Sequence, residues 1–143
     1  MAIVRKASAR WSGGLKDGKG AISTESGALD AYPYGFAARF EGQKGTNPEE
    51  LLGAAHAGCF TMALSLILGE AKLVATEMET TAKVSLDQVE GGYAITKVEL
   101  TLTARIPGAD QASFQELANM AKANCPLSKV IKADISLNAT LLS

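Results

Sequence analysis

The two cysteines are the residues of this sequence with the most distinctive chemistry, and their surroundings differ. Cys59 lies inside the apolar run LLGAAHAGCFTMALSLIL, whereas Cys125 directly precedes Pro126. A thiol reacts as its thiolate, which apolar surroundings disfavour and the start of a helix favours. A lone cysteine in an apolar helix is ordinarily packing. Two thiols in such different settings also suit an attacking and a resolving pair, in which a sulfenic acid on one closes to a disulfide with the other.

Three polar residues could influence Cys59. Arg39 would lower the pKa of a neighbouring thiol, and a carboxylate such as Glu49 would hold its guanidinium through a bidentate pair. His56 lies one turn before Cys59, where it could serve as the base of a Cys–His pair. Each also has a structural interpretation: a surface arginine, an acid at a helix start and a packing histidine. From these residues alone we prefer the structural interpretation for all three.

Composition limits the class of protein. The 143 residues are 47% hydrophobic and 20% charged, which predicts a single globular domain over residues 1–143. A net charge of −1 provides no basic surplus for nucleic acid. The start, MAIVRKASARWSGG, lacks the apolar stretch of a secretory signal, so we expect a cytoplasmic protein with reduced thiols. One histidine and two cysteines without a CxxC pair make a metal site unexpected.

The segment around Cys59 is predicted to be a helix. Asn47 suits the N-cap, Pro48 suits the first helical position, and Glu50 completes a capping box. From Leu51 to Leu68 apolar residues occupy every side, which favours a helix covered by a sheet or by a second subunit. Eighteen residues would barely cross a bilayer, and His56 and the glycines argue against a membrane span.

Spacing along this helix constrains any site that contains both Glu49 and Cys59. The two are ten residues apart, which corresponds to ~15 Å along a straight helix. Either the helix bends near Gly53 or Gly58, or Glu49 of one chain serves Cys59 of another. We favour the second arrangement, because a homodimer also explains a helix that is apolar on every side.

The segment that precedes this helix is polar and rich in glycine. Strands are predicted within Ile3–Trp11 and Ala21–Glu25, joined by a turn through Gly13–Gly20, and Phe36–Phe40 is predicted to be a third short strand.

After the helix the pattern changes to period two. Alternation over residues 78–86 and 98–106, on either side of Glu90–Gly91–Gly92, predicts a long antiparallel hairpin with one covered face. Asp110–Ala123 is predicted to be an amphipathic helix, Pro126–Lys132 a short helix capped by Cys125, and residues 135–141 a final strand. This order of elements indicates an α+β fold.

At this point the sequence resembles a known family. The segment NPEELLGAAHAGCF, followed far downstream by CPLSKVI, resembles the OsmC/Ohr family of thiol-dependent peroxidases over essentially the whole chain. The stretch FEGQKGTNPEELL resembles the osmotically inducible OsmC branch more than the Ohr branch. The resemblance implies an intertwined homodimer in which antiparallel sheets wrap long, buried central helices, with two active sites at the subunit interface.

The resemblance also implies residue roles. Cys59 would be the peroxidatic thiolate and Cys125 the resolving thiol, while Arg39 would stabilise the thiolate and Glu49 would orient Arg39. The substrates would be organic hydroperoxides and hydrogen peroxide. No bound cofactor is implied, because an external dithiol, for example of the lipoyl type, would reduce the disulfide.

Two alternatives stay open at this stage. The chain could form a non-enzymatic dimer that binds small apolar ligands at the subunit interface, or it could be a redox sensor. The sequence patterns of two other thiol families are not found in this chain. The peroxiredoxin pattern requires a proline and a threonine or serine where this chain has Leu52 and His56, and the thioredoxin CxxC pair is missing.

Overall fold

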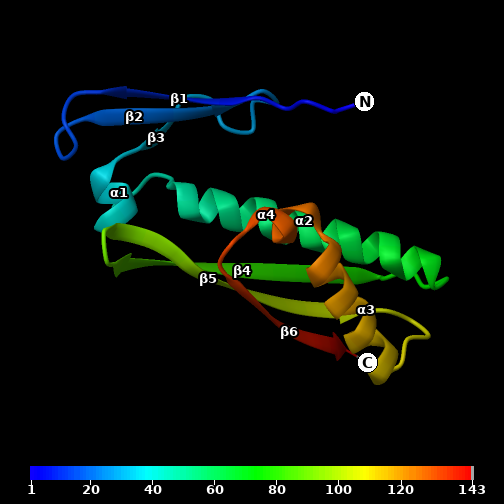
Figure 1. The fold of residues 1–143 in the computed structure, drawn as a ribbon. Helices are drawn as coiled ribbons and strands as arrows, with labels where there is room; N and C mark the ends of the chain where they lie inside the picture. The colour runs from blue at the N-terminus through cyan, green and yellow to red at the C-terminus, as the bar shows by residue number, and fades with distance from the viewer. Residues whose placement is uncertain (143) are drawn as a thin grey trace. The chain divides into compact units, whose positions relative to one another are not determined.

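The computed structural model describes residues 1–142 and shows an α+β fold (Figure 1). Contacts divide the chain into two compact units, Met1–Leu51 and the residues from Leu52 onward. Each unit contains one three-stranded sheet. Whether both units act as the single domain expected for residues 1–143 stays a prediction.

The first unit contains the predicted N-terminal hairpin. Strands β1 (Ala7–Ser12), β2 (Lys19–Thr24) and β3 (Tyr32–Tyr34) pair antiparallel in that order. Gly20 lies where two aromatic rings meet, since a Cβ there would come within 2.6 Å of the Trp11 ring and 2.5 Å of the Tyr34 ring. The sheet therefore requires glycine at this position of β2.

The prediction of a strand at Phe36–Phe40 was wrong, because these residues form the short helix α1 (Phe36–Phe40). Gly35 precedes the helix in an extended conformation at its N-cap. The rings of Phe36 and Phe40 then pack with their centroids 5.0 Å apart. The i,i+4 spacing of a helix permits this contact, whereas an extended strand would separate the two residues by about 13 Å. Five residues are too few for sequence periodicity to distinguish these cases.

Helix α2 (Pro48–Glu70) starts where the sequence predicted. The backbone N–H of Glu50 donates to Asn47 Oδ1 at 2.7 Å, which confirms Asn47 as the capping residue. The Glu50 carboxylate accepts a 2.7 Å hydrogen bond from the Thr46 hydroxyl, which connects the first turn of the helix to the preceding loop.

The second unit is built on the long hairpin. Strands β4 (Glu77–Val89) and β5 (Gly92–Arg105) pair antiparallel, and β6 (Asp134–Leu142) pairs with β5 in parallel, which alternation alone does not specify. The turn uses Gly91 and Gly92, whose φ angles of 91° and 140° favour glycine. The predicted covered face is confirmed, since Val98, Leu100, Leu102 and Ala104 of β5 are all buried.

Helices α2 and α3 (Gln111–Asn124) pack on the covered face of this sheet (Figure 1). The backbone of α2 comes close to β4 at Gly53, where a Cβ would lie 3.3 Å from the Val84 side chain. The largest buried apolar side chains come from both helices and β5: Phe60, Leu64, Leu68, Leu100, Leu102 and Phe114.

Only one side of α2 is covered within a single chain. Phe60, Leu64 and Leu68 are buried, whereas Met62 and Leu66 are 75% and 68% exposed. By length and hydropathy α2 could cross a membrane, but one of its faces instead packs against the sheet. The exposed side is apolar as well, so it is suited to contact with another apolar surface.

Candidate functional site

The two cysteines of the second unit lie in direct contact. The sulfur of Cys59, in the middle of α2, is 2.9 Å from the sulfur of Cys125. Both are free thiols, since a disulfide would require about 2.05 Å between the sulfurs. Cys125 is fully buried and Cys59 is partly exposed. The sequence left open whether the sulfurs are within reach of one another, and the structure shows that they are.

Cys125 is placed by the junction between two helices. Its N–H donates to the Ala121 carbonyl at 3.0 Å and ends α3, and its carbonyl accepts from the Lys129 N–H at 3.2 Å as α4 (Pro126–Val130) begins. Its ψ of 129° is the extended value that a following proline favours. The predicted N-cap position of Cys125 is therefore confirmed.

The hydrogen bonds at this junction act differently on the two sulfurs. Burial raises the pKa of the Cys59 thiol, and the contact with Cys125 raises that pKa further. Burial also acts to raise the pKa of Cys125, but hydrogen bonds from Cys59 and Ser128 outweigh it and leave that pKa lowered. Because the sulfurs are in contact, the two thiols titrate as a pair rather than independently. Within this pair the negative charge is more stable on Cys125, so an attacking thiolate at Cys59 requires additional stabilisation.

Arg39 and Glu49 form the predicted bidentate pair in the first unit. Arg39 Nε donates to Glu49 Oε1 at 3.0 Å, and Nη2 donates to Oε2 at 2.9 Å. Glu49 is buried at the start of α2, while the Arg39 side chain, on α1, is 36% exposed. The four predicted site residues therefore form two pairs, one in each unit.

His56 contacts a residue that the sequence analysis did not identify. Its Nε2 lies 2.8 Å from Ser128 Oγ, and the histidine is completely buried. Burial lowers the pKa of His56, so the imidazole is neutral near pH 7. No local pattern in the sequence points to Ser128, because it lies 72 residues from His56 along the chain.

An apolar cavity of about 710 Å³ opens at Cys59. Its walls come from α2, α3 and the start of α4, and it is lined by Cys59, Met62, Ala63, Leu66, Ile67, Glu70, Met120, Asn124 and Pro126. The cavity gives a small apolar molecule access to Cys59, whereas Cys125 is buried behind it.

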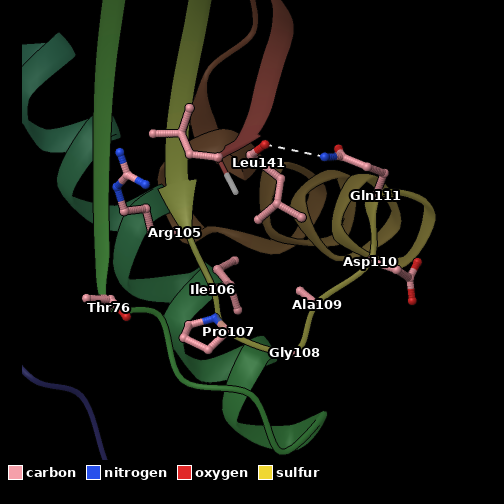
Figure 2. A pocket seen from close by; sticks show the side chains of 10 residues that line it. Thr76, Arg105, Ile106, Pro107, Gly108, Ala109, Asp110, Gln111 and Leu141 are labelled. Atoms are coloured by element: carbon pink, nitrogen blue, oxygen red, sulfur yellow. Dashed lines mark hydrogen bonds between the residues drawn. The ribbon is translucent and has the colours of Figure 1, made fainter.

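A second cavity, of about 570 Å³, lies where β5 ends and α3 begins (Figure 2). Figure 2 shows Ile106 and Leu141 lining its apolar part, and Gln111 reaching the Leu141 carbonyl through a 3.3 Å hydrogen bond. The residues that line this cavity include no cysteine or histidine. Of these two cavities, the one at Cys59 is therefore the candidate for thiol chemistry.

Comparison with known proteins identifies the family of the chain. The family model "OsmC-like protein" matches residues 41–140. The chain is 56% identical to Peroxiredoxin OsmC of Escherichia coli (strain K12) over 143 residues, the full length of both. It is 33% identical over 123 residues to the organic hydroperoxide resistance protein OhrB of Bacillus subtilis (strain 168), covering 85% of this chain and 88% of that protein.

Solved structures show the same architecture. The crystal structure of Bacillus subtilis OhrB superposes with a TM-score of 0.71 at 32% sequence identity, and the match covers 98% of each chain. The crystal structure of an OsmC-like protein from Mycoplasma pneumoniae, at 15% identity, has a TM-score of 0.76 over the full length of both chains and supports the fold alone. With a family model over residues 41–140 and a full-length relative at 56% identity, the chain belongs to the OsmC-like protein family.

Proposed function

We infer that this chain is a thiol-dependent peroxidase that reduces hydroperoxides through Cys59 and Cys125. The observation that carries this inference is the 2.9 Å contact between an accessible sulfur and a buried one. Relatives named as a peroxiredoxin and as organic hydroperoxide resistance proteins support the same function.

The chemistry proceeds in three steps. The Cys59 thiolate attacks one peroxide oxygen, the O–O bond breaks, and the alkoxide leaves and takes up a proton to give the alcohol. Cys59 is then a sulfenic acid, which the Cys125 thiolate attacks to form the disulfide while hydroxide leaves and is protonated to water. An external dithiol, the class of reductant that we propose, restores both thiols by two successive exchanges. The short distance between the sulfurs supports resolution without large rearrangement.

The first step requires a cation at Cys59, because burial and the Cys125 contact raise the pKa of that thiol. We assign this role to Arg39, which would also offset the charge that develops on the leaving oxygen. The bidentate pair with Glu49 supports the assignment, since it holds the guanidinium in one orientation before the substrate binds.

A homodimer is part of this proposal. The exposed side of α2 carries Ala54, Ala55, Gly58, Met62 and Leu66, small or apolar residues over which a second α2 could pack closely. In such a dimer Arg39 and Glu49 of one subunit would complete the site at Cys59 of the other. The cytoplasm is the compartment we propose, because both thiols must return to the reduced state.

The cavity at Cys59 supports a preference for organic hydroperoxides. Its walls are mainly apolar, with Glu70 and Asn124 as the polar residues, so an alkyl or aryl group would be desolvated there. We expect cumene or tert-butyl hydroperoxide to be consumed faster than hydrogen peroxide. Equal rates would contradict the preference.

Thiol titration tests the function. One equivalent of cumene hydroperoxide should remove both thiols within seconds, Cys59→Ser should abolish the reaction, and Cys125→Ser should retain oxidation of Cys59 while blocking the disulfide. Slow or partial loss of thiols would instead favour a protein that only binds apolar ligands in this cavity. Stoichiometric oxidation without turnover by any dithiol would indicate a redox sensor.

A further inference from the structure

The proposed reaction makes no use of His56, the completely buried histidine of α2. Its Nε2 lies 2.8 Å from the hydroxyl of Ser128 on α4. Its other ring nitrogen, Nδ1, is a buried atom without a hydrogen-bond partner among the described residues. The contact with Ser128 is therefore the hydrogen bond that offsets the loss of water around this ring.

This contact forms a second link between α2 and the α4 segment, beside the sulfur pair. His56 lies three residues before Cys59 on α2, and Ser128 lies three residues after Cys125, the N-cap of α4. Residues at this spacing are neighbours on one side of a helix. The two links, at 2.8 and 2.9 Å, therefore lie about one helical turn apart and join the same two segments.

Helix α4 has few buried contacts of its own. None of the five residues that the structure describes in α4 is buried, and Val130 is 75% exposed. Leu127 is only partly buried against the core. The turn itself is held together, because the Lys129 N–H donates to the Cys125 carbonyl at 3.2 Å. Segments with few buried contacts open locally at low cost, so a link at Ser128 also opposes opening at Cys125.

We propose that His56 is a positioning residue for the resolving thiol, and that its contact with Ser128 is a latch that holds α4 against α2. The latch keeps the Cys125 sulfur beside Cys59 and hidden from solution. Its role in resolution rests on the peroxidase function proposed above. The latch itself does not depend on that function, because its contacts are present while both thiols are free.

The latch matters most once Cys59 has become a sulfenic acid. The Cys125 thiolate must then attack the Cys59 sulfur, and the S–S bond forms as hydroxide leaves and is protonated to water. If α4 opens first, a second hydroperoxide molecule can transfer an oxygen to the sulfenic acid instead, which gives a sulfinic acid and the alcohol. Holding Cys125 in place therefore favours the reversible product over the irreversible one.

Alkylation of Cys125 measures the latch without any peroxide. In a Cys59→Ser background Cys125 is the one remaining thiol, and because it is completely buried, iodoacetamide reaches it only when the α4 segment opens. The labelling rate is then proportional to the open population. Ser128→Ala should raise this rate by about 5- to 30-fold, since the closed state would bury an imidazole without a hydrogen bond. His56→Leu should raise it by about fivefold, the usual effect of losing one hydrogen bond.

Two comparisons distinguish a latch from general loosening of the protein. Thr61→Val is the matched control, because the Thr61 hydroxyl donates to Thr80 of β4 at 2.7 Å and so connects α2 to the sheet instead of to α4. This variant should keep the labelling rate within about twofold of the background. The double variant His56→Leu/Ser128→Ala should label no faster than Ser128→Ala, because the same contact is absent from both. An equal rise in Thr61→Val, or multiplied effects in the double variant, would overturn the latch.

The resolution step provides the second test, in chains that contain both cysteines. With excess cumene hydroperoxide, mass spectrometry should show more sulfinic acid at Cys59 in Ser128→Ala than in the wild type, while the first oxidation of Cys59 keeps its rate. Faster labelling without additional sulfinic acid would overturn the role in resolution. Unchanged labelling in both single variants would overturn the latch, even if peroxide is consumed normally. If the wild-type protein fails to consume hydroperoxide while labelling changes as expected, the latch stands and the peroxidase proposal fails.

Discussion

The orienting role assigned to Glu49 gives the sharpest test of the proposed site. Replacing Glu49 by Gln keeps one oxygen that accepts a hydrogen bond from Arg39. The other oxygen becomes an NH₂ group, which cannot accept a hydrogen bond from the second N–H of Arg39. One of the two hydrogen bonds, at 3.0 and 2.9 Å, is lost. A charge-assisted hydrogen bond contributes about 1.5–3 kcal/mol when shielded from water. The Arg39 side chain is 36% exposed, so screening reduces this contribution to about 1 kcal/mol.

If that energy holds the guanidinium in its productive orientation, the oxidation of Cys59 should slow by about fivefold in Glu49→Gln. The assay is a rapid-mixing experiment in which cumene hydroperoxide is added, the reaction is quenched with an alkylating reagent, and free Cys59 is quantified by mass. Glu50→Gln is the matched control, since it removes the same charge one residue away from a carboxylate that bonds Thr46 instead of Arg39. Equal rates in the two variants would refute the orienting role, because only a general charge effect would remain.

Other measurements test the remaining parts of the structure. Burial lowers the pKa of His56 in the folded protein, so the unfolded chain binds more protons once the pH falls into the usual range of histidine. The free energy of unfolding should therefore decrease as the pH is lowered through that range, and the urea midpoint should fall less in His56→Leu than in the wild type. Phe114→Ala should lower the free energy of unfolding by about 3–5 kcal/mol, because Phe114 is a completely buried residue of α3. A loss below about 1 kcal/mol in urea unfolding would show that this core is not packed as described. Met62→Lys should weaken self-association measured by sedimentation, since Met62 is 75% exposed on the side of α2 assigned to the second subunit; an unchanged association constant would exclude that surface.

Much of the fold could be predicted from local patterns. The period-two alternation of β4 and β5 and the capping residue Asn47 lie as expected. Phe36–Phe40 was assigned wrongly because a five-residue apolar segment carries no resolvable period, and its helical state depends on the contact between two rings. The parallel pairing of β6 could not be predicted either, because alternation fixes which face is covered but not the direction of the neighbouring strand.

The candidate site shows the same division between local and tertiary information. The cap position of Cys125 followed from the proline after it, whereas the Arg39–Glu49 pair was preferred only on the family resemblance. The contact between Cys125 and Cys59 joins residues 66 positions apart, and spacing alone cannot specify it. The partner of His56 was missed for the same reason, since Ser128 is 72 residues away along the chain.

The parallel pairing of β5 with β6 has a consequence for biosynthesis. Cys125 lies in the crossover connection that joins these strands, and Gln115 and Lys122 of α3 donate hydrogen bonds to the carbonyls of Ala139 and Ile135 on β6. The crossover connection therefore takes its folded position only after β6 has joined the sheet. Strand β6 leaves the ribosome after both cysteines. In a nascent chain the two thiols, 66 positions apart, are not held against one another, so the fixed contact between the sulfurs forms only after translation has passed β6 and the sheet has closed.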